Sequence, residues 1–212
     1  MMLAEASVQS ANIWPALGGV LGTIVTAFLA AVFAMRYWKK QQYLQQRHAI
    51  AYSVIHQAIL VRDEFWRARS FVMTGNEVNA LKKQYEVTDE QVEEIKQQGA
   101  DPFKRIGHLG RFWNVQKQYS DLHTKSIELE ALLGDEYRDW LRPIEKLLRQ
   151  FYNAVQRYID PEYDVRTEGG SSKDLSLIVY GDRSQEDDVF GGEIESAIKQ
   201  VIDECRVYLI KK

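Results

Sequence analysis

The most prominent pattern along the chain is an uncharged apolar stretch near the N-terminus, IWPALGGVLGTIVTAFLAAVFAM, which is 23 residues long. A helix needs about 20 apolar residues to cross the hydrocarbon core of a bilayer. Trp14 lies at one end of the stretch, and Tyr37 and Trp38 lie just beyond the other, where amphipathic rings favour the bilayer interfaces. The pattern therefore predicts a transmembrane helix over 13–38, preceded by a short extracytoplasmic tail over 1–12.

A second pattern lies inside this stretch. Small side chains recur at every fourth position, which places them along one face of a helix: Gly18, Gly22, Thr26, Ala30 and Ala34. Such a face lets two helix backbones approach closely and pack. The row predicts self-association through this face, and the alternative is a Gly- and Ala-rich anchor that pairs with nothing.

The helical pattern continues beyond the apolar stretch. No Pro or Gly occurs between Tyr37 and Met73, and apolar residues recur at three- and four-residue steps: Ala51, Val54, Ala58, Val61, Phe65, Ala68 and Val72. This spacing predicts a juxtamembrane helix over 39–74 that stops near Gly75. The stripe is compatible with a parallel coiled coil or with packing inside the chain's own bundle.

The remaining chain alternates amphipathic helical patterns with Gly- and Pro-containing breaks. These patterns predict helices over 77–85, 88–98, 105–133, 135–159 (or from 142) and 193–210, with polar loops near 160–174 and 181–192. The short apolar run 175–180 fits either a helical turn or a strand. We therefore expect an all-α fold in which one N-terminal transmembrane helix continues into a helical bundle over 75–212.

The distribution of charge predicts an orientation. All 27 Lys and Arg residues follow Met35, and four of them lie directly after the apolar stretch: Arg36, Lys39, Lys40 and Arg47. Basic residues favour the cytoplasmic side of a membrane and contact its anionic lipids. We therefore expect a single-pass protein of the plasma (inner) membrane, with the N-terminus outside and the C-terminal part in the cytoplasm. A cleaved signal peptide is the alternative, but it would begin with a basic segment.

Charge is also divided along the rest of the chain. Residues 36–70 contain seven basic and two acidic side chains, whereas residues 182–204 contain eight acidic and two basic ones. The net charge of the whole chain is −3, so no basic excess predicts nucleic-acid binding. Cys205 is the only cysteine, which excludes an internal disulfide, and it falls on the apolar face of the last predicted helix.

No motif in the sequence predicts a cofactor, a metal ion or a catalytic residue. The four histidines lie outside any zinc-binding motif, and the glycine pairs form neither a P-loop nor a dinucleotide fingerprint. The acidic run at 186–188 lacks the alternating ligands of a calcium loop and is expected to be a solvated loop. The sequence therefore does not predict an enzyme.

Two segments carry a resemblance to known proteins. With its N-terminal apolar stretch and the segments DEFWRARSFV and DEYRDWLRPIEKLL, the chain resembles uncharacterised bacterial single-span membrane proteins with an all-helical cytoplasmic domain. The resemblance implies a helical layout and no catalytic residues. Arg67 and Arg69 are the polar positions of interest in this layout, and we expect them in solvent or in surface ion pairs.

Three functions are compatible with these patterns. The first is a membrane-tethered interaction or regulatory protein at the inner membrane face, with the lipid bilayer, a second copy of the chain and an unidentified cytoplasmic protein as partners. The second is an oligomerising membrane-acting effector, such as a stress or phage-defence toxin. The third is an enzyme whose site lies between helices and has no linear motif.

Overall fold

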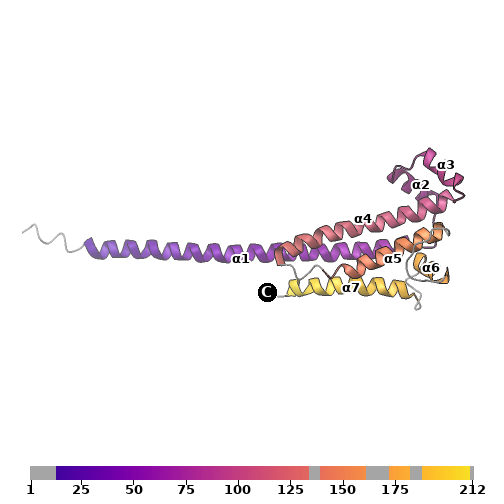
Figure 1. The fold of residues 1–212 in the computed structure, drawn as a ribbon. Helices are drawn as coiled ribbons and strands as arrows, with labels where there is room; N and C mark the ends of the chain where they lie inside the picture. Colours follow the sequence, from indigo (N-terminus) through magenta and orange to yellow (C-terminus); the bar gives the residue numbers. More distant parts are fainter. Residues whose placement is uncertain (1–12, 134–138, 161–171, 182–187, 211–212) are drawn as a thin grey trace, which may run out of the picture. The chain divides into compact units, whose positions relative to one another are not determined.

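The computed structural model describes the backbone of residues 13–133, 139–160, 172–181 and 188–210. It describes the side chains of these ranges from residue 22 onward, except those of 172–174 and 210. All regular structure in this part of the chain is helical, which confirms the predicted all-α class. The helices are α1 (Ile13–Ala68), α2 (Gly75–Gln84), α3 (Asp89–Gln97), α4 (Pro102–Leu133), α5 (Arg142–Ile159), α6 (Ser172–Val179) and α7 (Val189–Ile210) (Figure 1).

The predicted transmembrane helix and single-pass localisation are wrong. Within the described residues, no helix combines the length and the apolarity needed to cross a membrane. In the described part of α1, the charged side chains of Arg36, Lys39 and Lys40 follow directly after Met35. The side chains of 13–21, the first part of the predicted span, lie outside the described residues.

The chain divides into two compact units, Met1–Gln46 and Arg47–Lys212, and the boundary lies within α1. In the first unit, the described side chains of α1 are almost all exposed. In the second unit, the stripe at three- and four-residue spacing is covered from Ala51 to Ala68. The stripe ends there because α1 stops at Ala68, and Val72, which follows the helix, is exposed.

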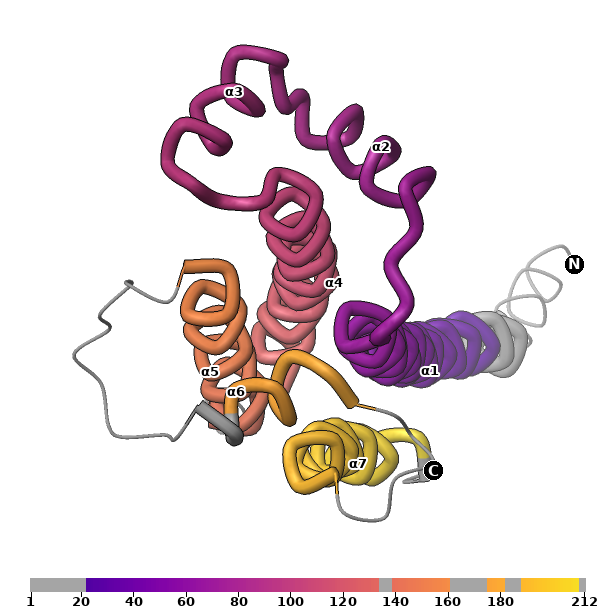
Figure 2. The backbone as a smooth tube through the Cα atoms, turned by 90° about the vertical axis from the view of Figure 1, so that its right-hand side faces the viewer, coloured from indigo at the N-terminus to yellow at the C-terminus, as the bar shows by residue number. Residues whose placement is uncertain are grey.

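The core of the second unit lies between the latter part of α1 and helices α4, α5 and α7, which surround it in the end-on view (Figure 2). Each helix contributes one apolar stripe, as amphipathic helices of a bundle do. Phe65 of α1, Phe112 of α4, Phe151 of α5 and Phe190 of α7 meet in this core. Cys205 of α7 is also buried there, and burial raises the pKa of its thiol to about 12.

A smaller apolar cluster joins α2 and α3 to the N-terminal half of α4. Val78 and Leu81 of α2 pack against Ile106 of α4. The backbones approach closely at Gly110 of α4, because a Cβ atom there would lie only 3.0–3.1 Å from the side chain of Leu81. Helix α3 begins with the capping box predicted at Thr88, but it buries no side chain fully. It is therefore attached to α4 less tightly than α2 is.

The structure also defines the elements of the C-terminal part of the chain that the sequence leaves open. The run 175–180, which fitted a turn of helix or a strand, belongs to α6 except for Tyr180, which directly follows the helix. Helix α5 starts at Arg142, so Pro143 occupies its first turn, where its missing N–H costs no hydrogen bond. Most of the polar loops predicted near 160–174 and 181–192 lies outside the described residues.

Candidate functional site

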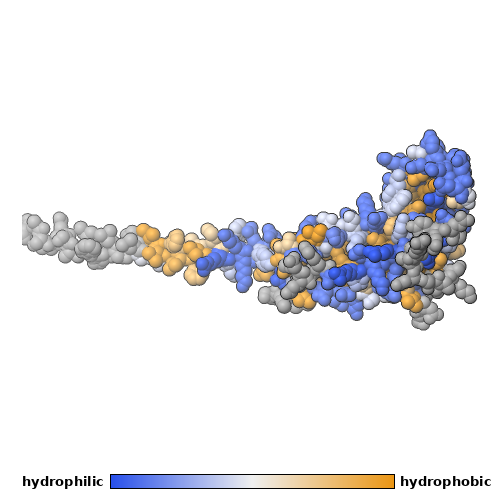
Figure 3. Space-filling view, in the orientation of Figure 1, coloured by the Kyte–Doolittle hydropathy of each residue, from blue (hydrophilic) through white to orange (hydrophobic). Residues whose placement is uncertain are grey.

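The first candidate site is the exposed apolar part of α1. Eight large apolar or aromatic side chains between residues 24 and 38 are at least half exposed: Ile24, Val25, Phe28, Leu29, Phe33, Met35, Tyr37 and Trp38. We call these eight residues the α1 apolar surface, and the visible face of this helix segment is largely apolar in Figure 3. A helix that is apolar around much of its circumference normally lies against other apolar groups. This segment is therefore a candidate for association.

The small residues of the predicted pairing row lie beside this surface. Gly22, Thr26, Ala30 and Ala34 are all exposed, and a Cβ atom added at Gly22 would meet nothing within 4 Å. The Thr26 hydroxyl donates to the carbonyl of Gly22 over 2.8 Å, so this polar group is satisfied within the helix. Gly18 precedes Gly22, the first residue whose surroundings are described. The row is thus accessible from Gly22 onward, and its role in pairing stays a prediction.

The predicted basic cluster is divided between the two units. Arg36, Lys39 and Lys40 are exposed on the first unit. Arg47 belongs to the second unit, where its guanidinium lies 4.7 Å from the centre of the Tyr208 ring of α7 in a cation–π contact. Arg47 therefore stabilises the bundle by holding the end of α7, while the other three side chains remain available to external groups.

A second candidate site is a buried ion pair near the C-terminal end of α1. Arg69 is fully buried, and Asp188, the residue before α7, accepts two hydrogen bonds from its guanidinium at 2.7 and 2.9 Å. The remaining guanidinium donors reach backbone carbonyls at the end of α6: Arg69 Nε donates to Ile178 over 2.9 Å, and Nη2 donates to Leu177 over 2.7 Å. One side chain thus joins α1, α6 and α7.

Two glycines make room for this ion pair. A Cβ atom at Gly181 would collide with the Arg69 guanidinium and the Asp188 carboxylate, and one at Gly191 would collide with Trp66 and the same carboxylate. Asp188 is also the N-cap of α7, because its Oδ1 accepts from the Gly191 N–H over 2.9 Å. The prediction that Arg69 lies in solvent or in a surface ion pair is therefore wrong. Arg67 does lie in an exposed position, where its Nη1 is 3.3 Å from Oε2 of Glu64.

A second buried arginine stabilises the connection between α1 and α2. Arg111 of α4 binds the Glu77 carboxylate through Nε and Nη2 at 2.6 and 2.8 Å, and it also donates to the carbonyls of Ser70 and Val72 at 2.6 Å. The hydrogen bonds from Arg111 are the main reason why the pKa of Glu77 is below its usual value. The sequence does not distinguish Arg111 from other polar residues, because it lies within the amphipathic pattern of a long helix.

Next to these arginines, the buried His108 forms a polar group with the half-buried Tyr158 and Tyr180. The Tyr180 hydroxyl lies 3.1 Å from His108 Nε2 and 2.9 Å from the Tyr158 hydroxyl, and the three rings pack edge to face. Only 4% of His108 is exposed. Burial, together with the positive charges of Arg111 and Lys104, lowers its pKa to about 4. His108 is therefore neutral at pH 7.

The pKa of His108 predicts how stability changes with pH. Unfolded His108 binds a proton below about pH 6.5, whereas the folded protein binds it only below about pH 4, so acidification in this window favours unfolding. His108 should therefore cost up to about 3 kcal/mol of unfolding free energy as the pH falls from 7 to 4. In urea titrations across this range, His108→Gln should lose less stability than the wild type, because it lacks the imidazole. The carboxylates titrate in both proteins, so the difference between the two pH curves reports on His108. Parallel pH curves would contradict this assignment.

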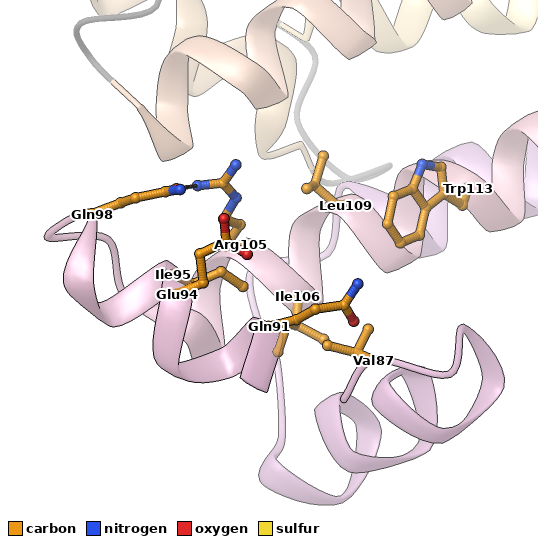
Figure 4. A pocket seen from close by; sticks show the side chains of 9 residues that line it. All are labelled: Val87, Gln91, Glu94, Ile95, Gln98, Arg105, Ile106, Leu109 and Trp113. Carbon is orange, nitrogen blue, oxygen red and sulfur yellow. Dashed lines mark hydrogen bonds between the residues drawn. The ribbon is translucent and has the colours of Figure 1, made fainter. Parts of the chain in front are cut away.

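The third candidate site is a pocket between α3 and α4, which we call the α3–α4 pocket (Figure 4). It has a volume of about 260 Å³. Its apolar lining consists of Val87, Ile95, Ile106, Leu109 and Trp113, and its polar lining consists of Gln91, Glu94, Gln98 and Arg105. Arg105 Nη1 donates to Gln98 Oε1 over 3.0 Å. The pocket therefore combines an apolar wall with two opposite charges.

Other features that would point to a known activity are missing from the described residues. Within them, no group of three or more His, Cys, Asp or Glu side chains converges in a way that could hold a metal ion. Comparison with other proteins gives no further guide, since no protein family, curated protein or solved structure matches the chain.

Proposed function

We propose that this chain is a helical interaction protein that self-associates through the α1 apolar surface. The observation that carries the proposal is the exposure of eight large apolar side chains on one helix segment, at 50–71% of each residue's surface. Large apolar patches that stay exposed on a folded chain commonly mark sites of association. Among the described residues, α4, α5 and α7 each bury an apolar stripe in a shared core.

The shape of α1 favours a second copy of the chain as the partner. At 100° per residue, Ile24, Val25 and Phe28 fall on one side of the helix, and Thr26, Ala30 and Ala34 fall on another. Helices pack by inserting ridges of large side chains into grooves between smaller ones. Because one helix carries both a ridge and a groove, two copies of α1 can complement each other.

The energies are of the size that a reversible pair requires. Burying a large apolar side chain contributes roughly 1.5–3 kcal/mol. Eight such side chains, four from each copy, would therefore contribute on the order of 10 kcal/mol even when partly exposed at the edges of the contact. Association of two chains costs roughly 4–15 kcal/mol. Pairing should consequently depend on most of the surface, and the loss of two large side chains should weaken it clearly.

A split-reporter assay tests the proposal. The two reporter halves are fused to the C-terminus of the full chain and expressed together in cells. We expect a signal for the wild type and a decrease of at least tenfold in association for Phe28→Asn combined with Leu29→Asn, because polar side chains replace the ridge. Ala30→Ile should also weaken association, because the added side chain fills the groove.

Matched variants on other exposed positions serve as controls. Leu177→Asn on α6 and Ala80→Ile on α2 change the same residue types outside α1, and both should keep the wild-type signal. Expression levels and far-UV circular dichroism of each variant verify that the bundle still folds. A wild-type chain without a signal, or a ridge variant with an unchanged signal, would refute self-association through α1.

A further inference from the structure

The α3–α4 pocket holds two opposite charges that have no charged partner in the described part of the chain. Arg105 and Glu94 both line the pocket, yet neither forms an ion pair there, with each other or with another residue. Gln98 accepts one hydrogen bond from Arg105 and so holds its guanidinium, whose other N–H groups remain able to donate. The two charges are therefore available to a ligand.

The two charged groups and the two largest apolar groups lie at different ends of the pocket. In Figure 4, Glu94, Gln98 and Arg105 lie together at one end, and Leu109 and Trp113 lie at the other. A ligand that matches this arrangement has a positive and a negative group close together at one end and a large apolar body at the other. We propose that the α3–α4 pocket binds a free amino acid with a large apolar or aromatic side chain.

Each part of such a ligand has a counterpart in the pocket. The α-carboxylate would accept hydrogen bonds from the Arg105 guanidinium, a pairing that is stronger than hydrogen bonding between neutral groups. The α-ammonium group would donate to the Glu94 carboxylate. The side chain of the ligand would lie against Leu109 and the ring of Trp113, where aromatic rings gain from edge or offset stacking.

The size of the pocket also favours a ligand of this class. Small-molecule sites usually have volumes of roughly 300–1,000 Å³, and this pocket of about 260 Å³ lies just below that range. It suits a ligand of amino-acid size and is too small for a nucleotide or a folded peptide segment. Helix α3 buries none of its side chains fully, so a bound ligand would cover apolar surface of Val87 and Ile95 that is half exposed without it.

Isothermal titration calorimetry on the purified full chain tests this proposal with four probes. L-tryptophan carries both charges, L-tryptophanamide lacks the carboxylate, indole-3-propionate lacks the ammonium group, and indole lacks both. We expect L-tryptophan to bind most tightly, in the submillimolar to millimolar range set by a ligand of about 15 non-hydrogen atoms. Each missing charge should weaken binding by about tenfold, since one charged hydrogen bond is lost.

Two variants test which residue of the pocket binds each charged group of the ligand. Arg105→Gln should weaken binding of L-tryptophan and indole-3-propionate by about tenfold and leave L-tryptophanamide unchanged. Glu94→Gln should weaken L-tryptophan and L-tryptophanamide and leave indole-3-propionate unchanged. Lys104→Gln and Glu93→Gln are matched controls on the same helices outside the pocket lining, and both should bind as the wild type does.

The outcomes separate this proposal from simpler ones. Equal affinity for indole and L-tryptophan would show an apolar cavity without amino-acid recognition and would overturn the proposal. Absence of heat with all four probes at millimolar concentration would also overturn it. Because all four variants change exposed or half-exposed polar side chains, unchanged thermal unfolding curves will verify that each remains folded. The result is independent of α1 pairing, which this experiment does not require.

Discussion

Replacing Asp188 with Ala is expected to lower the free energy of unfolding by about 3–5 kcal/mol, because the change leaves the Arg69 guanidinium buried without a counter-charge. Arg69 is fully buried and only 6% of the Asp188 side chain is exposed, so water cannot replace the lost carboxylate without opening the structure. The variant also loses the N-cap of α7, which adds about 1 kcal/mol. Urea unfolding followed by far-UV circular dichroism measures the change.

Two further variants separate the contributions of charge and capping. Asp188→Asn keeps an oxygen that can accept from the Gly191 N–H, so it should recover the capping part of the loss and little of the charge part. Arg142→Ala breaks an exposed ion pair with Asp139 and should cost less than about 1 kcal/mol. A loss below about 1.5 kcal/mol for Asp188→Ala would mean that Arg69 is accessible to water in solution.

The buried ion pair between Arg69 and Asp188 is a feature that no local sequence pattern predicts. The segment DEFWRARSFV drew attention to Arg69, but its partner lies 119 residues away and no local pattern connects the two. The charge division between 36–70 and 182–204 was visible, and the structure shows that some of these charges meet: Arg69 with Asp188, and Arg62 with Glu195 at 4.0 Å. Opposite charge alone does not reveal that one of these pairs is buried.

Local sequence patterns predicted the helices well, because apolar spacing and capping depend on residues that lie within a few positions of one another. The stripe from Ala51 to Ala68 is buried as its three- and four-residue spacing requires. The Thr88–Gln91 capping box forms both of its hydrogen bonds, since it depends only on residues within one turn. The stop of the first helix came earlier than expected, because Arg69 turns away from the helix end to bind α6 and α7.

The α3–α4 pocket and the buried polar side chains could not be predicted from local patterns, because they depend on how the helices pack. His108 and Arg111 lie within an amphipathic helix, where a sequence cannot show which polar side chains another element will cover. The α3–α4 pocket exists because α3 contributes no fully buried side chain. A loosely packed helix of this kind follows from tertiary geometry, so Glu94 and Arg105 read as ordinary surface charges in the sequence.

Within α1, the same helical spacing has two outcomes. From Ala51 onward the apolar stripe faces α4, α5 and α7 and is buried, whereas the eight residues of the α1 apolar surface are exposed in the described part of the chain. The apolar stretch was predicted to be a membrane span from its composition, but hydropathy alone does not specify what covers an apolar surface. The contrast within one helix is the structural basis for proposing a second copy of α1 as its partner.

Replacing Phe151 with Ala is expected to lower the free energy of unfolding by about 3–5 kcal/mol, because the cavity left in the core cannot be filled without moving several helices. Only 1% of Phe151 is exposed, and its ring lies 5.8 Å from that of Phe65 and 6.4 Å from that of Phe190, measured between ring centres. One side chain therefore connects α5 with α1 and α7. Urea unfolding of the variant measures the loss.

Phe71→Ala is the matched control, since it removes the same group from a position that is 81% exposed. Its ring touches only the Tyr180 ring among the described aromatic contacts, at 5.3 Å, so the loss should stay below about 1 kcal/mol. Equal losses for the two variants would mean that the bundle is not held by the core around Phe151. A large loss for Phe151→Ala alone would show that the latter part of α1 folds as one unit with α5 and α7, because each helix contributes a ring to the same contact.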